Sequence, residues 1–465
     1  MNEQARILFV GTPSEQRLSE GVPGSVAESV ADKAGAEIDG GARLLRPDRL
    51  QLVFEPVCLD ELVPPEHRVR QVWAFAQRVN TDELEDRVRS RDGHSGAPAI
   101  PPRLLLALWL YACLDGVGSA RELDRLCREH AAYRWLCGRV GVNYHTLSDF
   151  RAESGSFLDH LLTEMIAAMV KAGVVDGSTI CQDGTKVRAA AGSSSFRREQ
   201  TLGRLQEEAR AHVQRVKAQA DDQELNARVR AARERAARER LERVNAAIES
   251  MKTMKEDKER KKAKPGYHDK SKSEPRASTT DADARKMKMS DGGTRPAYNV
   301  QLGTDAKSRA IVGVRVVTQG NDQGQSAGMR QHVEERTGVK VGEHITDGGY
   351  LSKGVIEAEE QAGVKCYIPL PKNNKGEPAT SPQPNDGPGV AQWRERMQTQ
   401  EAKEKIKQRG GIAETPNGEL KAQRGLDRML VRGIEKVTAV MLLGAIVYNF
   451  THFTETWIGR PLVPW

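Results

Sequence analysis

The chain has 465 residues, of which 38% are hydrophobic and 29% charged, with a formal net charge of +7 and a sequence pI near 9.0. This length supports two to four domains of about 100–200 residues each in a soluble, globular chain. Six cysteines without a tight spacing pattern argue against a disulfide framework, and the basic balance favours a partner that carries phosphates.

Membrane and targeting segments are not indicated. The longest apolar stretch, residues 437–450, is shorter than the roughly 20 residues that a membrane span needs, so we predict a buried helix there. The first ten residues do not form the apolar run and cleavage pattern of a signal peptide. We therefore expect a cytoplasmic protein with no membrane partner.

The N-terminal third is predicted to be helical after a poorly ordered arm at residues 1–50. In the module at residues 51–172, prolines open an apolar helix near residue 102, and Ser119 and Asn143 are placed to cap two more helices. Short helices joined by glycine turns suit a helix-turn-helix DNA-binding module, with Arg121 and Arg125 among its exposed arginines. An ordinary helical bundle with a solvated arginine face is the alternative.

A long charged segment interrupts the chain after a first strand at residues 179–183. Residues 204–264 contain neither Gly nor Pro and carry 18 basic and 12 acidic residues. Apolar residues at 241, 244, 248 and 251 follow coiled-coil spacing. We predict a basic helical insertion and linker at residues 196–279, either one straight helix or a helical hairpin. This insertion would be a solvated arm whose charges pair with one another, an arm that contacts DNA, or a dimerisation element.

The second half alternates strands and helices. Residues 296–302 and 310–317 predict a β-hairpin, and residues 344–347 and 365–369 predict two further strands. The helices are expected at 323–337, 352–362, 393–408 and 411–453, with the last one broken near Gly425 or Gly433. Residues 456–465 are expected to form a tail.

Carboxylates at the ends of two predicted strands suggest a metal site. Asp183 and Asp347 each follow an apolar strand, so neighbouring strands would bring both to one edge of a sheet. Glu414, in a predicted helix, could supply a third carboxylate. Two Mg²⁺ ions held by carboxylates can activate the attacking oxygen and stabilise the leaving oxygen in phosphodiester cleavage. An Asp in this position is more often only a helix cap.

The residues around these carboxylates resemble the DDE transposases of bacterial insertion sequences. The resemblance is carried by Gln182-Asp183-Gly184-Thr185-Lys186, by Thr346-Asp347-Gly348-Gly349-Tyr350, by Glu414 with Lys421 seven residues later, by the stretch from Asp291 to Asn299, and by the block from Ser119 to Phe150. It covers about residues 50–455. It implies a ribonuclease-H-like catalytic domain, here at residues 173–195 and 280–455, in an α+β or α/β chain.

The resemblance also implies roles for individual residues. Asp183, Asp347 and Glu414 would be the catalytic and metal-binding residues for Mg²⁺ or Mn²⁺, with two ions expected. The residues that we predict to contact DNA are Lys186, Arg409, Lys421, Arg424, Arg121 and Arg125. The family often has a tyrosine three residues before the arginine that corresponds to Arg409, and this chain has Ile406 there. Glu419 competes with Glu414 as third carboxylate, and spacing to Lys421 favours Glu414.

The expected function is metal-dependent cleavage of double-stranded DNA at transposon ends followed by strand transfer into target DNA. Cutting two ends implies a homodimer or larger assembly, associated with the nucleoid. The alternatives are a metal-dependent nuclease without strand transfer and a catalytically inactive DNA-binding protein derived from a transposase. The latter predicts that metal does not matter to function.

Overall fold

The computed structural model describes residues 56, 58–90, 97–218, 227–263, 274–372, 376, 378–381 and 383–459. The chain divides into two units, residues 1–56 and 57–465, and every helix and strand named below belongs to the second. The arm predicted at residues 1–50 and most of the predicted tail lie outside the described residues.

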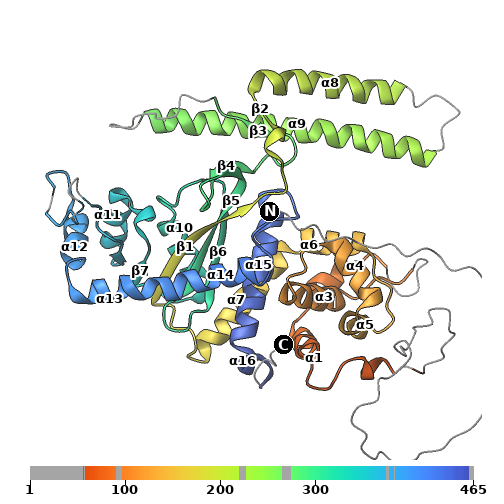
Figure 1. Cartoon of the computed structure of the whole chain (residues 1–465), viewed down its shortest axis with the longest axis horizontal. Helices are drawn as coiled ribbons and strands as arrows, with labels where there is room; N and C mark the ends of the chain where they lie inside the picture. The colour runs from red at the N-terminus through yellow and green to blue at the C-terminus, as the bar shows by residue number, and fades with distance from the viewer. Residues whose placement is uncertain are drawn as a thin grey trace, which may run out of the picture. The chain divides into compact units, whose positions relative to one another are not determined.

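Helices α1 to α7 form the first part of the described chain (Figure 1). They are α1 Arg68–Arg78, α2 Asp82–Asp86, α3 Pro102–Leu114, α4 Ala120–Glu129, α5 Ala131–Cys137, α6 Tyr144–Glu153 and α7 Gly155–Lys171, preceded by the 3-10 turn η1 Leu59–Leu62. The predicted caps are confirmed, since Ser119 accepts from the backbone N–H of Glu122 and Asn143 from that of Thr146. Helix α3 is buried from Leu104 to Leu114, which explains its lack of a polar face.

One mixed sheet forms the second part of the chain. Its strands are β1 Thr179–Arg188, β4 Arg285–Lys288, β5 Thr294–Asp305, β6 Ile311–Val317, β7 Glu343–Ile345 and β8 Lys365–Tyr367. The order is β4-β5-β1-β7-β8, and β6 pairs with β5. The predicted hairpin is confirmed as the antiparallel pair β5–β6. A separate small ribbon joins β2 Phe196–Arg197 to β3 Ala277–Ser278, just after the 3-10 turn η2 Ser193–Ser195.

Strand β1 is longer than the sequence predicts. It continues five residues beyond Asp183, to Arg188, because β5 pairs with it antiparallel from Ile180 to Arg188. The prediction that Asp183 ends its strand is therefore wrong, since this residue lies in the middle of β1. Asp183 nevertheless lies near the end of a neighbouring strand, because β7, the short parallel partner on the other side of β1, ends at Ile345.

The two faces of the sheet pack against different helices. Ile180 and Val187 of β1 belong to a large core shared with the N-terminal helices and with α10 Ser326–Thr337 and α15 Ile434–His452. Cys181 belongs to a second core beneath a group of later helices. Strand β1 therefore has apolar contacts on both of its faces, as expected of a strand inside the sheet.

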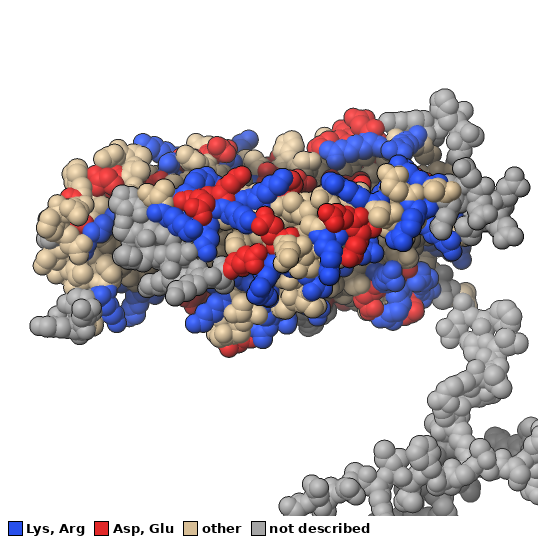
Figure 2. Space-filling view, turned by 90° about the horizontal axis from the view of Figure 1, so that it is seen from above, with Lys and Arg blue, Asp and Glu red and all other residues tan. Residues whose placement is uncertain are grey.

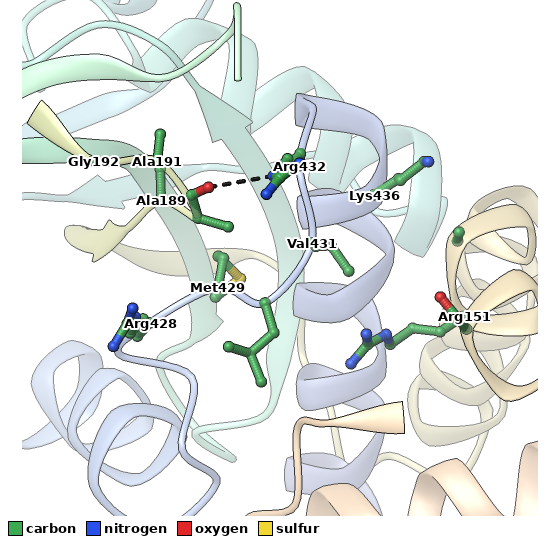
Figure 3. Close-up of a pocket in the computed structure, with 13 residues that line it drawn as sticks. Arg151, Ala189, Ala191, Gly192, Arg428, Met429, Val431, Arg432 and Lys436 are labelled. Atoms are coloured by element: carbon green, nitrogen blue, oxygen red, sulfur yellow. Dashed lines mark hydrogen bonds between the residues drawn. The ribbon is translucent and has the colours of Figure 1, made fainter. Parts of the chain in front are cut away.

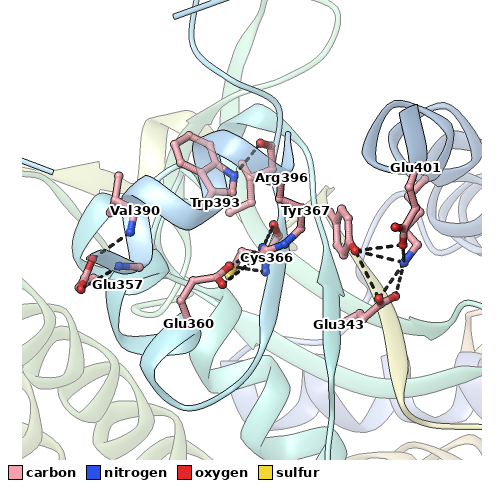
Figure 4. Close-up of polar contacts among 12 residues, drawn as sticks. Glu343, Glu357, Glu360, Cys366, Tyr367, Val390, Trp393, Arg396 and Glu401 are labelled. Carbon is pink, nitrogen blue, oxygen red and sulfur yellow. Dashed lines mark hydrogen bonds and ion pairs between the residues drawn. The ribbon is translucent and has the colours of Figure 1, made fainter. Parts of the chain in front are cut away.

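The helices over the second core are joined to one another and to the sheet by ion pairs (Figure 4). They are α11 Lys353–Gln361, α12 Pro388–Arg396 and α13 Gln400–Arg409. Arg396 of α12 forms a two-pronged ion pair with Glu360, and Lys405 of α13 binds Glu343 of β7 at 2.6 Å. These charges are partly buried, so they fix the position of α13, which leads directly into the segment carrying Glu414.

The C-terminal helices differ from their predicted boundaries. The chain is helical from α13 through the π-helical turn η5 Gly410–Glu414 into α14 Thr415–Ala422, so no break falls between residues 408 and 411. The predicted break at Gly425 or Gly433 is confirmed, since both have positive φ (64° and 89°) and α15 begins only at Ile434. A short helix α16, Thr454–Ile458, and the 3-10 turn η4 Gly348–Tyr350 complete the described elements.

Helix α15 contains the apolar stretch for which the sequence predicts a buried helix. Among the described residues it alone has the length and composition to cross a membrane, and 72% of its apolar window is buried inside the protein. The residues from Ala439 to Phe450 are all buried, against α7, β6 and α3. The prediction of a core helix is therefore confirmed.

The charged insertion forms two helices, α8 Glu199–Ala218 and α9 Ala227–Lys262, that pack along each other. Its connecting residues 219–226 lie outside the described part of the chain. Val244 and Met251, on the apolar side of α9, are buried within this hairpin. Lys and Arg alternate with Asp and Glu on the face seen in Figure 2, in agreement with ion pairs such as Lys262–Glu259. The apolar residues with coiled-coil spacing therefore pack inside this hairpin of a single chain.

Two glycines let α3 and the end of α14 approach closely. Gly116 (φ +74°) and Gly425 (φ +64°) face each other, and a Cβ on Gly425 would lie 2.9 Å from the carbonyl oxygen of Gly116. The Nη1 of Arg424 donates to the carbonyl of Leu114 at 2.8 Å beside this contact. The N-terminal helices are thereby attached to the segment that follows Glu414.

Substitution of Gly425 tests this attachment. We expect Gly425→Ala to lower the free energy of unfolding by about 1–3 kcal/mol, because alanine is strained at positive φ and its Cβ meets a backbone carbonyl. Thermal denaturation of the purified variant measures the effect. The matched control is Gly418→Ala in α14, where nothing lies within 4 Å of the added Cβ; this change should be neutral or stabilising. Equal melting temperatures for the two variants would contradict the proposed attachment.

Candidate active site

The register of the sheet brings Asp183 and Asp347 side by side. Strands β1 and β7 are parallel, with Cys181 opposite Ile345, so the same register continued by two residues sets Asp183 opposite Asp347. Asp347 follows the end of β7 and caps η4, its side chain accepting from the N–H of Gly349 at 2.8 Å. It is therefore both a cap and a neighbour of Asp183.

Asp183 is partly buried and incompletely neutralised. Burial raises the pKa of Asp183 to about 6; the Arg409 guanidinium and the Asn417 amide oppose this rise, and the nearby Asp347 adds to it. The Nδ2 of Asn417 donates to Asp183 Oδ2 at 2.9 Å, whereas Arg409 approaches only to 3.9 Å. A cation closer than Arg409 would favour the charged form of this carboxylate.

A π-helical turn places Arg409 and Glu414 on the same side of their helix. A π turn aligns residues five apart, and the Nη2 of Arg409 donates to Glu414 Oε1 at 3.0 Å. Pro416, early in α14, has no N–H for the regular ladder just after this turn. Arg409 thus lies between Asp183 and Glu414, and the side chain of Glu414 is 62% exposed.

Glu419, the rival third carboxylate, faces away from this cluster. Its two oxygens bind Arg424 at 2.6 Å and His452 at 2.7 Å, and its side chain is only 10% exposed. Arg424 itself is 6% exposed and also donates to Leu114. The prediction that Arg424 contacts DNA is therefore corrected, because the charge of this residue is used inside the protein.

Asp322 is a fourth carboxylate close to the site. Its Oδ1 accepts from Asn299 at 2.8 Å and from Gln301 at 2.7 Å, two buried amides on β5. It lies against Gly184, where any Cβ would clash with it. No local motif marks this residue, since only the pairing of β5 with β1 brings its partners beside Asp183.

Gln301 is the centre of a buried network beneath the carboxylates. Its Oε1 accepts from Gln182 at 2.7 Å and from the hydroxyl of Tyr350, while its Nε2 donates to Asp322. Burial raises the pKa of Tyr350, with further contributions from Asp322, Asp183 and Asp347. The network therefore connects β1, β5 and the loop after Asp347.

A basic pocket of about 300 Å³ opens beside the carboxylates. It is lined by Gly184, Thr185, Lys186, Lys288, Met289, Ser290, Asp322 and Lys421. Lys421 donates to the hydroxyl of Thr185 at 3.1 Å, and Lys186 to the carbonyl of Lys288 at 2.9 Å. Two of the predicted DNA-contacting residues are thus placed next to Asp183, with room for a phosphate.

Arg409, also predicted to contact DNA, lies beside Asp183 and Glu414, whereas two further predicted DNA-contacting residues lie elsewhere. Arg121 and Arg125 are on α4 and do not line this pocket. Arg121 is exposed and stacks over the ring of Tyr144, 4.8 Å from its centroid. Arg125 is paired with both Glu122 and Glu129, so its charge is already balanced on the helix surface.

The donor set suits a hard divalent cation, although the carboxylates are not yet gathered as ligands. Among the described residues, no group of three His, Cys, Asp or Glu side chains has the arrangement of a metal site. However, Asp183 and Glu414 share one guanidinium, and Asp347 is close enough to Asp183 to raise its pKa. Mg²⁺ and Mn²⁺ prefer carboxylate oxygens as ligands, and these side chains would supply them if the exposed Glu414 turned inward.

A mixed sheet with paired carboxylates on adjacent parallel strands and a third on a crossing helix fits the ribonuclease-H-like class of phosphoryl-transfer proteins. Comparison with protein families agrees with this class. Residues 57–153 match a transposase domain of the type DUF772, and residues 268–450 match the transposase DDE domain. No curated protein sequence matches the chain. The chain belongs to the insertion-sequence DDE transposases, a family that acts on DNA and is generally dependent on divalent metal.

Neither family match includes residues 154–267, so Asp183 lies outside both. Its assignment depends on the sheet register with Asp347 and on its contacts with Asn417 and Arg409. Asp347 and Glu414 lie within the DDE match.

Replacing Gln301 tests the network beneath the site. We expect Gln301→Met to lower the free energy of unfolding by about 2–4 kcal/mol, because it leaves Gln182, Asp322 and Tyr350 without their buried partner. Urea denaturation measures this loss. Gln361→Met, at an exposed position of α11, is the control and should change stability by less than about 0.5 kcal/mol. A loss no larger than the control's would show that the network does not hold the site together.

Proposed function

We propose that this protein cleaves DNA at transposon ends and joins the freed ends to target DNA, with Asp183, Asp347 and Glu414 as its catalytic carboxylates. The observation that carries the proposal is the position of Arg409, which contacts Asp183 and Glu414 at once. Asp183 and Glu414 are far apart in the sequence, and they contact the same guanidinium because the fold brings them close together. The parallel register with β7 adds Asp347 to the same place.

The three carboxylates would hold one or two Mg²⁺ or Mn²⁺ ions. When bound, such ions lower the pKa of an attacking oxygen and stabilise the oxygen that leaves phosphorus. Asn417 orients Asp183 through its hydrogen bond, and Arg409, which holds Glu414 in this structure, would have to release it for that carboxylate to bind the metal. Glu419 is excluded from this set by its pairing with Arg424 and His452.

The reaction has two in-line displacements at phosphorus. In the first, a water oxygen bonds to the phosphorus at the transposon end, the bond to the 3′-oxygen breaks, and that oxygen takes up a proton. In the second, the freed 3′-hydroxyl attacks a phosphodiester of target DNA and displaces its 3′-oxygen, with transfer of one proton. In this joining step one phosphodiester forms for each one broken, so no ATP is required.

The basic pocket beside the carboxylates is suited to hold the DNA strand during these steps. Lys186, Lys288 and Lys421 line it together, and they would neutralise phosphates next to the one that reacts. Arg121 on α4 would contact DNA at a distance from the chemistry. We assign no such role to Arg125, whose charge is met by two glutamates.

Asp322 is proposed as a positioning residue. It holds Asn299 and Gln301 in place through one carboxylate oxygen. Through Gln301 it fixes Tyr350, which follows the loop that begins at Asp347. Its negative charge also makes the binding of a cation by the carboxylate cluster more favourable.

The alternatives make different predictions about products. A nuclease without strand transfer would cut the same ends but release no joined DNA. A catalytically inactive DNA-binding protein would bind without metal dependence and would not cut. The shared contact of Asp183 and Glu414 with Arg409, the nearby Asp347 and the lysine-lined pocket favour an enzyme over the inactive protein. Because two transposon ends must be handled together, we expect a homodimer or larger assembly on DNA.

Carboxamide substitutions test the triad. Asp183→Asn, Asp347→Asn and Glu414→Gln should each lower cleavage and joining by at least about 10³-fold while DNA binding is kept, because each removes a charged metal ligand. Gel analysis of cut and joined products with Mg²⁺ or Mn²⁺ measures both steps. Glu395→Gln, an exposed change on α12, is the control and should be fully active. Normal cleavage by any of the three variants would remove that residue from the site.

The role of Asp322 is separable from metal binding. We expect Asp322→Ala to lower the rate of cleavage by about 10–100-fold, and Asp322→Asn to restore most of it, because the amide oxygen can still accept from Asn299 and Gln301. The Mg²⁺ concentration for half-maximal rate should stay the same in both variants. If Asp322→Asn is as inactive as the alanine variant and needs more Mg²⁺, Asp322 is a metal ligand instead.

A further inference from the structure

A second basic cavity lies at the far end of β1, outside the carboxylate site (Figure 3). It has a volume of about 590 Å³ and is bounded by three segments: α6, the residues just after β1, and the chain from Arg428 into the start of α15. It therefore lies between the N-terminal helices and the sheet. None of the proposed catalytic residues lines it.

The residues that line this cavity are basic or neutral. Its charged lining residues are Arg151, Arg428, Arg432 and Lys436, and no Asp or Glu is among the lining residues. The last three are exposed. Arg428 and Lys436 have no ion pair within the described part of the chain, and Arg432 makes one long bond, 3.4 Å, from Nε to the carbonyl of Ala190. Their charge is available to a ligand.

Arg151 adds a buried positive charge to the cavity. It is 7% exposed, stacks on Trp109 with its guanidinium 4.4 Å from the ring centroid, and donates to the carbonyl of Gly118. Its Nε is buried without a hydrogen-bond partner. Burial lowers the pKa of Arg151 to about 10, and no carboxylate offsets this cost. A buried arginine without an acidic partner is best stabilised by an anion in the adjoining cavity.

The wall of the cavity that follows β1 is almost without side chains. Ala189, Ala190, Ala191 and Gly192 form it, so a bulky, charged backbone can approach closely. Leu430, another lining residue, is 53% exposed, which gives an apolar surface among the arginines. Basic residues on two segments, with a smooth wall formed by the third, suit an extended chain of phosphates better than a single small anion.

The distance from the carboxylate site suits DNA that is bound at both places. Ala189 lies six residues beyond Asp183, directly after the end of β1, about 20 Å away at roughly 3.3 Å per extended residue. DNA rises about 3.4 Å per base pair, so this distance corresponds to about six base pairs. A duplex with its reacting phosphate at Asp183 therefore reaches the cavity after about half a helical turn.

We propose that the groove formed by Arg151, Arg428, Arg432 and Lys436 binds the phosphate backbone of the transposon-end duplex about half a turn from the cleaved bond. The inference rests on the proposed function, because it takes the scissile phosphate to lie at Asp183. The groove is made jointly by α6 and by residues around β1 and α15, so DNA bound there also holds the N-terminal helices against the sheet.

The test is DNA binding in EDTA, where no cleavage takes place. Fluorescence anisotropy of a labelled duplex carrying one end of the element is measured against salt for the triple variant Arg428→Ala, Arg432→Ala, Lys436→Ala. We expect affinity to fall by about tenfold or more. The slope of log K against log salt should decrease by about 2.7, that is, about 0.9 for each phosphate that the variant no longer neutralises.

The matched control removes three lysines at the opposite end of the strands. Lys171, Lys307 and Lys365 are exposed and lie near the start of β1, not its end. The triple variant Lys171→Ala, Lys307→Ala, Lys365→Ala changes net charge equally and should keep the wild-type slope. An equal change in both triple variants, or no change in the groove variant, overturns the proposal.

A second pair of variants leaves every arginine in place. Ala191→Glu puts a negative charge on the smooth wall and should weaken binding, whereas Ala191→Gln, of similar size, should bind more tightly than the Glu variant. Equal affinities for these two variants count against the groove. The readout is independent of catalysis. If the wild-type protein binds but never cuts, the proposed function fails while the groove is still tested. If it cuts normally and the groove variants bind normally, only the groove fails.

Discussion

Strand β1 is paired along both edges, and the arrangement of the site follows from this constraint. Antiparallel pairing with β5 extends β1 past Asp183 and sets Gln301 and Asn299 opposite Gly184 and Lys186. Parallel pairing with β7 on the other edge aligns Asp183 with Asp347. A slip of one residue in either register would turn Asp183 to the opposite face of the sheet, away from Asn417 and Arg409. The buried amides of Gln182 and Gln301 oppose such a slip, because each would lose its partner.

Electrostatics then decides what the site can hold. Several carboxylates lie close together, and burial raises the pKa of Asp183. Arg409 is the nearest positive charge, but it approaches Asp183 only to 3.9 Å. The π turn that positions Arg409 beside Glu414 leaves that glutamate largely exposed and able to change rotamer. A site with excess negative charge and one movable carboxylate is suited to bind a divalent cation. The groove at the other end of β1 has the opposite character, since its buried Arg151 lacks an acidic partner.

Local sequence signals predicted much of the fold. Ser119 and Asn143 marked helix starts because their side chains cap regardless of tertiary context, and the β5–β6 hairpin followed from alternation and a polar turn. The length of β1 could not be predicted, because pairing with a strand more than 100 residues away extends it. Arg424 was misassigned for a similar reason: its partner Leu114 lies more than 300 residues away in the sequence, and the packing of this distant segment buries Arg424 with Glu419. Asp322 and the groove at Arg428 lack any local motif and exist only through the packing of separate segments.

The central claim is that Asp183, Asp347 and Glu414 bind metal together. The most direct measurement is anomalous diffraction from crystals of the protein grown with Mn²⁺. Our account predicts an anomalous peak bounded by these three carboxylates, at oxygen distances of roughly 2.1–2.2 Å, with Glu414 turned away from Arg409 and Glu419 still bound to Arg424 and His452. A Mn²⁺ ion bound only elsewhere, or held by Glu419 in place of Glu414, would contradict it.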